Sequence, residues 1–239
     1  MKRRIAGIAA LLLPVALPAW ADETQSGFGA DAPETFSMVK ADLDGTQSHG
    51  LGLFNWDAEG WYGGDTNKLW LSTQGLLRGN ALDDGETEAL WSRNIADYWD
   101  FQAGVGEDFA PTGRTYAVFG FEGLAPYFFE TQAHAFISDR GDVSARIKQW
   151  IDLPVTQHLF VEPHGQVDLA IQNVPDERVG SGVSDIELGL QTRYEVTRKF
   201  APYIDLVWSK AFANTASYDR INNEPPDELT LRAGIRLWF

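Results

Sequence analysis

Apolar and polar residues alternate with a period of two in segment after segment of this chain. In LTLRAGIRLWF (229–239), one parity carries Leu229, Leu231 and other apolar residues, and the opposite parity carries Arg232 and Arg236. Segments of about ten residues with the same alternation recur upstream, and helical spacing does not fit them. A period of two is the pattern of a strand with one apolar and one polar face. The chain is therefore predicted to be all-β.

Turn signals divide these segments into about twelve predicted strands. The strands are expected at roughly 35–43, 50–62, 68–79, 87–95, 98–107, 114–124, 127–137, 143–153, 157–171, 184–197, 202–212 and 228–239. Short breaks (63–67, 96–97, 125–126, 154–155 and 198–201) alternate with longer polar breaks (44–49, 80–86, 108–113, 138–142, 172–183 and 213–226). Alternating short and long connections between an even number of strands are typical of an antiparallel transmembrane β-barrel. Both ends of the barrel chain are then expected on the periplasmic side.

In such a barrel the apolar parity faces lipid and the polar parity faces the lumen. Arg232 and Arg236 are expected to point inward and to pair with lumen acids, with Lys40 and Asp42 of the first strand nearby. The alternative is a soluble β-sandwich or a lipocalin-like barrel, which also alternates but has its polar face in water. Two stacked sheets, or Leu188 and Leu231 pointing inward, would identify that alternative.

The first residues have the pattern of a secretory signal. Three basic residues precede an apolar run and the sequence Ala19-Trp20-Ala21, which predicts a cleaved leader over 1–21. Residues 22–34 are polar and predicted to form a short flexible segment, and 35–239 are predicted to form the barrel.

Charge and cysteine content narrow the function classes. The formal net charge is −15 with the leader, and the leader contributes three of the positive charges. An acidic excess of this size argues against nucleic acid as a partner and favours cations. The absence of cysteine excludes thiolate catalysis and cysteine-based metal sites.

Six ordered motifs point to one family. They are WDAEGWYGGDTNKLWL (56–71), YWDFQAGVGEDF (98–109), RTYAVFGFEGLAPYFFE (114–130), GDVSAR (141–146), SGVSDIELGLQTRYE (181–195) and FAPYIDLVWSK (200–210). Together they resemble the copper resistance protein B family over the chain from about residue 35.

The resemblance implies an outer-membrane barrel of a Gram-negative bacterium that binds or moves copper ions, as Cu(I) or Cu(II). It implies outer-membrane lipids and a periplasmic copper-binding protein or oxidase of the same resistance system as further partners. Family members often carry a Met- and His-rich amino-terminal segment. Residues 22–34 contain neither residue, so the barrel itself is expected to handle copper.

Strand parity assigns candidate residues to the lumen. The acids expected to attract cations are Asp57, Glu59, Glu122, Asp168, Asp185 and Glu187. An electronegative interior would concentrate cations, whereas side chains of opposite charge commonly fill small barrels as ion pairs. Most individual acids are expected to be ion-paired, and the excess of acids over bases is what favours cation passage.

Histidines supply the candidate copper ligands, because imidazole suits copper better than carboxylate alone. His134 and His164 are each seven residues into their predicted strands and are expected near the same level. The hypothesis is a low-affinity copper station formed by His134, His164, Glu130 and Glu162, with Met38 and His158 as flanking ligands. The alternative for each histidine is an ordinary hydrogen-bonded residue of the lumen.

Two other functions remain as alternatives. A barrel hydrolase of the lipase type would use a serine such as Ser48, beside His49, or Ser144, but no nucleophile elbow surrounds either serine. A structural barrel with a packed lumen would transport nothing. The sequence therefore favours a protein that is not an enzyme.

Overall fold

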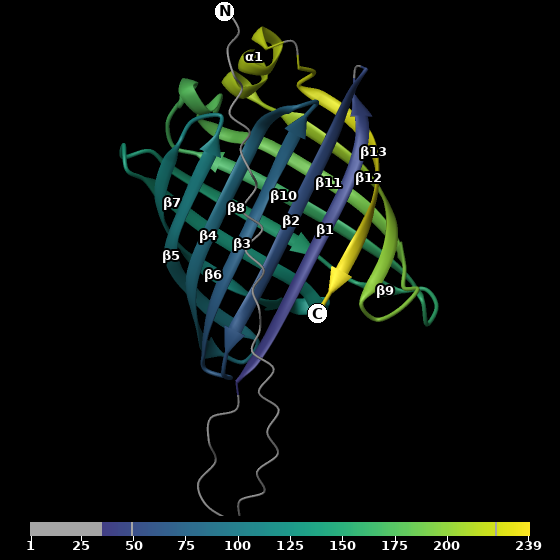
Figure 1. Cartoon of the computed structure of the whole chain (residues 1–239). Helices are drawn as coiled ribbons and strands as arrows, with labels where there is room; N and C mark the ends of the chain where they lie inside the picture. Colours follow the sequence, from purple (N-terminus) through teal and green to yellow (C-terminus); the bar gives the residue numbers. More distant parts are fainter. Residues whose placement is uncertain (1–34, 49, 223) are drawn as a thin grey trace, which may run out of the picture. The chain divides into compact units, whose positions relative to one another are not determined.

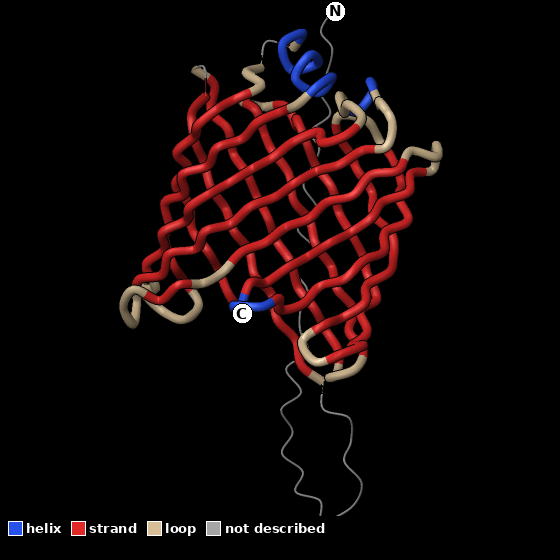
Figure 2. The backbone as a smooth tube through the Cα atoms, turned by 180° about the vertical axis from the view of Figure 1, so that it is seen from behind, coloured by secondary structure: helices blue, strands red, loops and turns tan. Residues whose placement is uncertain are grey.

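The computed structural model describes residues 35–239 except His49 and Asn223. The expected leader and the segment 22–34 lie outside the described residues, as do His49 and the side chain of Ser48. The described chain forms one antiparallel sheet that closes into a barrel (Figures 1 and 2). Its strands are β1 (Phe36–Ser48), β2 (Leu51–Gly63), β3 (Asn67–Arg78), β4 (Ala81–Ala96), β5 (Trp99–Ala110), β6 (Arg114–Ala125), β7 (Phe129–Ser138), β8 (Val143–Trp150), β9 (Leu153–Pro154), β10 (Leu159–Ala170), β11 (Gly182–Tyr194), β12 (Phe200–Ala211) and β13 (Asp227–Trp238).

Twelve of these strands form the wall, which confirms the predicted architecture. Each wall strand pairs with two neighbours, and β1 closes the ring against β13 with Asp42 opposite Arg236. The two-residue β9 pairs only with β10. Strand β1 begins and β13 ends at the lower end in Figure 1, where the backbones of Val39 and Phe239 exchange two hydrogen bonds of 2.9 Å.

Two of the expected long breaks are strand instead. Residues 44–48 continue β1, and residues 81–86 begin β4. The β1–β2 and β3–β4 turns, both at the upper end, are therefore tight. The stretch 81–86 contains Asp83, Asp84 and Glu86 and does not alternate cleanly. A strand that extends beyond the apolar band of a membrane is wetted on both faces, so it needs no alternation. The prediction of a loop at 80–86 was wrong for this reason.

Short helices interrupt several of the connections. The 3-10 helix η1 (Pro126–Phe128) lies between β6 and β7 at the lower end, and η2 (Pro175–Glu177) lies between β10 and β11 at the upper end. The α-helix α1 (Ala213–Ile221) occupies the expected break 213–226 and lies at the upper end in Figure 1. The hydroxyl of Thr215 in α1 accepts a hydrogen bond from Gly180 N, which ties the helix to the β10–β11 connection.

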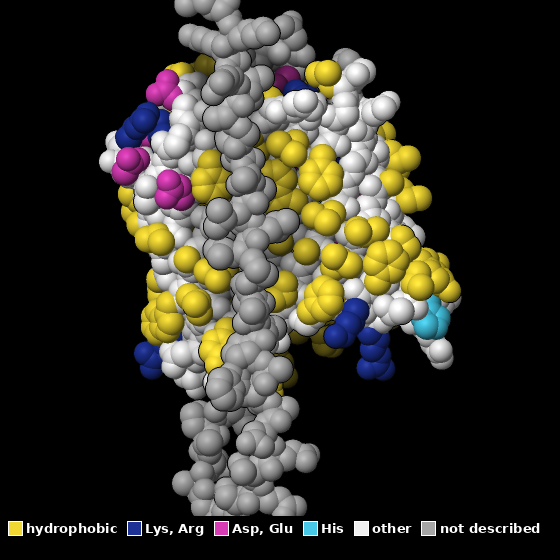
Figure 3. Space-filling model, viewed as in Figure 1, with side chains coloured by type: hydrophobic (Ala, Val, Ile, Leu, Met, Phe, Trp, Pro, Cys, Tyr) yellow, Lys and Arg dark blue, Asp and Glu magenta, His cyan; other side chains and the backbone are white. Residues whose placement is uncertain are grey.

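The outer wall is apolar, as expected for a surface in contact with lipid. Leu188 is 51% exposed and Leu231 is 61% exposed on the outside of the barrel. Figure 3 shows hydrophobic side chains across the wall that faces the viewer, with charged side chains towards the two ends. The outward parity of both leucines and the single closed sheet rule out the sandwich alternative. No helix in the described part of the chain is long and apolar enough to cross a membrane.

Candidate functional site

The interior of the barrel is polar and contains two cavities. The upper cavity has a volume of about 480 Å³ and is lined by thirteen carboxylate side chains and four arginines. The lower cavity, about 400 Å³, is lined by ten carboxylates, five lysines and arginines, and two histidines, His134 and His164. Both cavities therefore have more acidic than basic side chains in their walls.

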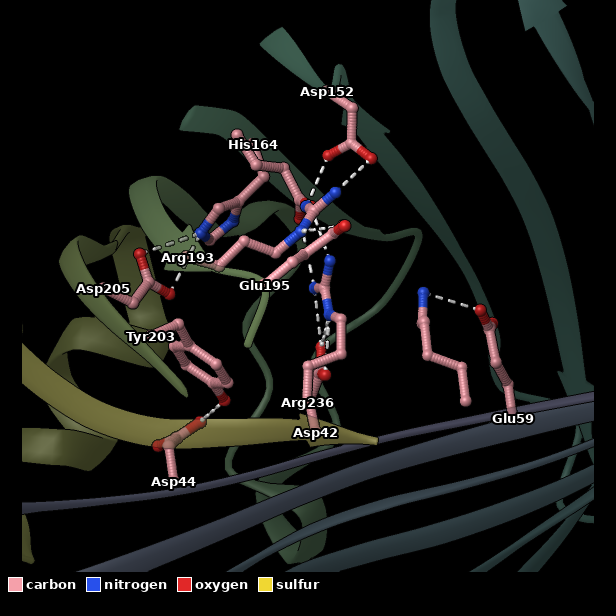
Figure 4. A network of polar contacts seen from close by, with 12 residues as sticks. Asp42, Asp44, Glu59, Asp152, His164, Arg193, Glu195, Tyr203, Asp205 and Arg236 are labelled. Atoms are coloured by element: carbon pink, nitrogen blue, oxygen red, sulfur yellow. Dashed lines mark hydrogen bonds and ion pairs between the residues drawn. The ribbon is translucent and has the colours of Figure 1, made fainter. Parts of the chain in front are cut away.

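An ion-pair network on the inner face of the barrel links β10, β11, β13 and β1 (Figure 4). Glu162 on β10 accepts hydrogen bonds from Arg193 Nη1 at 2.6 Å and from Arg236 Nη1 at 2.7 Å. Arg236 also donates from Nε and Nη2 to Asp42, at 2.8 and 2.7 Å. Arg193 donates to both carboxylate oxygens of Asp152, at 2.5 and 2.6 Å. The prediction that both arginines pair with lumen acids, with Asp42 nearby, is confirmed: Arg236 pairs with Asp42, and Arg232 lies 3.4 Å from Glu187 on β11.

This network bears on the prediction that Glu162 is a copper ligand. Glu162 as a residue is 7% exposed, and its carboxylate is held by two arginines. A carboxylate saturated by guanidinium groups has little negative charge left for a metal ion. The structure therefore places Glu162 in the framework of the lumen and not beside a free ligand position.

The six acids expected to attract cations divide into paired and unpaired groups. Glu59 pairs with Lys40 at 2.7 Å, Asp168 with Arg146 at 2.8 Å, and Glu187 with Arg232. Glu122 accepts a hydrogen bond of 2.7 Å from Gln102 Nε2. Among the described residues, Asp57 and Asp185 form no ion pair with a basic side chain. Three of these six acids are therefore ion-paired, which is half of the set and not most of it as expected.

His134 is packed into the wall of the lumen. It is 4% exposed, and its Nε2 lies 2.8 Å from Gln102 Oε1. Its Nδ1 lies 3.7 Å from Glu88 Oε2, and its ring meets Phe136 edge-on. Opposite it on β6 is Gly120, where an added Cβ would come within 2.7 Å of the imidazole. The glycine thus makes room for the ring, and the ring has partners on all sides.

His164 is more open to the lower cavity. Its Nε2 lies 3.1 Å from Asp205 Oδ2, which comes from β12 two strands away. Its side chain is 22% exposed. The ring lies over Gly189 of β11, where a Cβ would come within 2.1 Å of Nε2. This arrangement places an imidazole and a carboxylate together at the surface of the cavity.

The two histidines do not share one level, contrary to the prediction. His134 lies opposite Arg146 on β8, whereas His164 lies opposite Trp150. Four residues of β8 correspond to roughly 13 Å along the strand, in addition to two strand spacings of about 5 Å each. One ion cannot bridge them at this separation. Within residues 35–239, apart from positions 49 and 223, no group of three or more His, Asp and Glu side chains is arranged to hold a metal ion.

The other predicted ligands occupy different positions. Glu130 is exposed at the lower end of β7, directly opposite Trp150. His158 precedes β10 in an exposed turn, with its ring 6.0 Å from that of Tyr194, so it is not part of the barrel wall. Met38 lies on β1 opposite Trp61, on the parity of Lys40 and Asp42, near the lower end.

Several lumen acids were missed by the sequence reasoning. Asp84, Glu86 and Glu88 on β4 and Asp108 on β5 line the upper cavity. The first two fell in the predicted loop 80–86, and Asp108 fell in the predicted break 108–113. The pairing of Asp205 with His164 was also missed, because a contact across two strands leaves no signal in a single sequence.

The upper mouth is covered by the β10–β11 connection. Glu177 of η2 contacts Thr112 and lies 2.9 Å from Arg114 Nε. The next residue, Arg178, reaches Asp83 at 3.2 Å and Glu224 at 3.5 Å. In the turn between β7 and β8, a hydrogen bond from Gln172 and an ion pair with Arg114 lower the pKa of Asp142. In α1, burial and the nearby Glu224 raise the pKa of Asp219.

Ser144, the serine considered for a hydrolase, lines the upper cavity on β8 opposite Phe136 and Ala170. Its hydroxyl makes no hydrogen bond to a histidine within the described residues. The structure thus provides no serine–histidine pair at this position.

Comparison with known proteins identifies relatives of the whole barrel. Residues 35–239 match the family model "Copper resistance protein B precursor (CopB)". The chain is 38% identical over 185 residues to the copper resistance protein B homolog of Pseudomonas syringae pv. tomato, covering 77% of this chain and 63% of that protein. It is 33% identical over 210 residues to copper resistance protein B of Escherichia coli, covering 87% of this chain and 71% of the relative.

Solved structures show the same kind of fold at low sequence identity. The NanC porin superposes with a TM-score of 0.55 at 14% identity, covering 84% of this chain and 99% of the porin. The KdgM porin superposes with a TM-score of 0.51 at 9% identity, with the same coverage. These likenesses concern the fold alone.

Proposed function

Because this chain belongs to the copper resistance protein B family, we propose that it contributes to copper resistance by admitting copper ions into an acidic lumen in the outer membrane. The closed barrel and its apolar wall suit that membrane. The proposed cargo is a copper cation that enters a cavity and leaves again, so weak and repeated contacts serve better than one tight site.

The excess of carboxylates in the two cavities carries the proposal. Thirteen acids face four arginines in the upper cavity, and Asp185 there has no basic partner among the described residues. In the lower cavity, Asp57 likewise has no basic partner within the described part of the chain. Clefts lined by one sign of charge between low-dielectric walls raise the local concentration of counter-ions. The lumen is thus expected to attract cations from either mouth.

Removing the two unpaired acids tests this proposal. In the Asp57→Asn, Asp185→Asn double variant, reconstituted in lipid vesicles, the initial rate of copper entry is expected to fall severalfold at low salt. The difference should shrink at physiological ionic strength, where the Debye length is about 8 Å. Copper entry is measured with a copper-sensitive dye inside the vesicles.

The matched control removes the same charge outside the lumen. Asp65 and Asp97 are exposed in turns at the lower end, and their replacement by Asn should leave the entry rate close to that of the parent. If both double variants lose the same fraction of the copper entry rate, the net charge of the whole protein attracts copper, and the acids of the lumen have no special effect.

We further propose His164 as the lumen residue that contacts copper most directly. It faces the lower cavity beside Asp205, and imidazole with carboxylate suits Cu(II). His134 is enclosed by Gln102, Glu88 and Phe136 and has less room for an ion. Met38 and Glu130 are proposed as flanking contacts towards the lower end, the thioether being suited to Cu(I).

The two histidines can be tested separately because they lie at different levels. His164→Ala is expected to weaken copper binding by about tenfold, equivalent to about 1.4 kcal/mol. His134→Ala, which also removes one imidazole, is expected to change copper affinity far less. Titrations of the purified barrel with Cu(I), Cu(II) and Zn(II) measure the affinities. If His134→Ala has the larger effect, the assignment is reversed.

The proposal includes no catalytic step, and its partners are copper ions and outer-membrane lipids. The periplasmic copper-binding protein or oxidase expected from the family resemblance would meet the lower end, where β1 begins. The hydrolase alternative has no supporting observation at Ser144.

A further inference from the structure

Side chains from nearly opposite walls meet in the middle of the lumen. Lys148 Nζ on β8 donates a hydrogen bond of 2.9 Å to Gln74 Oε1 on β3. Arg146, also on β8, donates from Nη1 to Glu86 Oε1 on β4 at 2.5 Å. In the ring of twelve strands β3 and β8 are five places apart, so these contacts span the lumen. We call Gln74, Glu86, Arg146 and Lys148 the crossbar.

On each side of the lumen, a crossbar side chain also hydrogen-bonds to a residue of the adjacent strand. Gln74 lies opposite Glu86 in the β3–β4 ladder and donates to it at 2.5 Å. Arg146 lies opposite Asp168 in the β8–β10 ladder and donates to it at 2.8 Å. The guanidinium also stacks on Phe136, with its carbon 5.5 Å from the ring centre. The side chains that span the lumen are therefore held in position by their neighbours.

The crossbar lies at the boundary between the two cavities, together with other residues that line both of them. Gln74, Glu86 and Arg146 line both the upper and the lower cavity, and Lys148 lines the lower one. A solute passing from one cavity to the other must pass these side chains. The crossbar also places two positive charges, Arg146 and Lys148, in the middle of an otherwise acidic passage.

We propose that the crossbar is the barrier to ions in this barrel and that it sets which ions pass. The acids of both cavities attract cations, but a cation at the crossbar meets Arg146 and Lys148 and must displace the contact between Lys148 and Gln74. Dehydration and repulsion at a constriction determine selectivity in channels generally. The inference rests on the proposed function for its biological purpose, since a barrier matters only if ions pass. The barrier itself is a property of the lumen towards any small ion.

Potassium conductance tests the barrier without copper. The full chain is inserted into planar lipid bilayers in potassium chloride, and single-channel conductance is measured. The parent should conduct poorly, and Lys148→Ala should raise the conductance by roughly tenfold, because the contact across the lumen is lost. Gln74→Ala should raise it in the same direction without changing any charge, which separates opening of the lumen from electrostatics.

Lys68 on β3 supplies the matched control. Its Nζ pairs with Asp100 on β5 at 2.9 Å and lies over the ring of Trp61 on the adjacent β2, so these contacts stay on one side of the barrel. Lys68→Ala should leave the conductance near that of the parent. A parent that conducts like an open porin, or a Lys68→Ala variant that gains as much as Lys148→Ala, would overturn the proposal.

Selectivity gives a second readout. Arg146→Gln removes one of the two positive charges of the crossbar, so the reversal potential in a salt gradient should shift towards greater preference for potassium over chloride. An unchanged reversal potential would show that Arg146 does not influence ion selection. Failure of the copper proposal would leave these potassium results intact, whereas failure of the crossbar would leave the effect of Asp57 and Asp185 on copper entry intact.

Discussion

Replacing Glu162 by alanine is expected to lower the free energy of unfolding of the barrel by roughly 3–5 kcal/mol. Glu162 is buried and is shared by Arg193 and Arg236, which approach from β11 and β13. Without its carboxylate, two guanidinium groups remain close together in the lumen. Asp152 and Asp42 each neutralise one of them in part, which keeps the expected loss from being larger.

Urea unfolding in lipid vesicles, followed by tryptophan fluorescence, measures the change. The control is Asp176→Ala, which breaks the ion pair of Asp176 with Arg140, 3.4 Å apart and exposed on both sides. Exposed pairs contribute about 1 kcal/mol or less. Glu162→Gln keeps the shape of the side chain and should fall between the two. A Glu162→Ala variant no less stable than Asp176→Ala would show that the network does not stabilise the barrel.

A charge introduced on the outer wall is expected to have the second largest effect. Leu231 lies in the middle of β13 and is exposed on the outside of the barrel. Leu231→Arg should cost roughly 2–4 kcal/mol if this position faces the centre of the bilayer. The arginine would have to reach the interface or draw water into the hydrocarbon region.

An arginine introduced inside the lumen, at position 57, provides the control for Leu231→Arg. Asp57 faces the lower cavity beside Asp42, its partner across β1 and β2. Asp57→Arg places the same guanidinium next to an acid in a wet cavity, so its cost should be small. Both variants are compared by the same unfolding titration. If Leu231→Arg is as stable as Asp57→Arg, residue 231 does not face lipid.

The wall of the barrel could be predicted from the sequence because lipid and lumen impose opposite requirements on adjacent residues. That constraint placed Leu188 and Leu231 outside and Arg236 inside. It also required the first strand to meet the last, which is why Asp42 was expected to lie near Arg236. The constraint acts only within the apolar band, so the acidic start of β4 was mistaken for a loop.

Contacts across the lumen could not be predicted in the same way. The level of a residue depends on the stagger between strands, and a single sequence does not report it. Counting from the predicted strand starts placed His134 and His164 together, but their partners on β8 are Arg146 and Trp150. The pairing of Arg236 with Glu162 was missed for the same reason, since β10 and β13 are three places apart in the ring.

The connection that covers the upper mouth has a consequence for the cell envelope. Glu177 and Arg178 fasten η2 to Arg114 of β6 and to Asp83 of β4, on the far side of the opening from β10 and β11. A bulky solute such as an antibiotic would have to detach this connection before it could enter. A bacterium that inserts many copies of this barrel would therefore keep the permeability barrier of its surface, which it would lose by inserting as many wide pores.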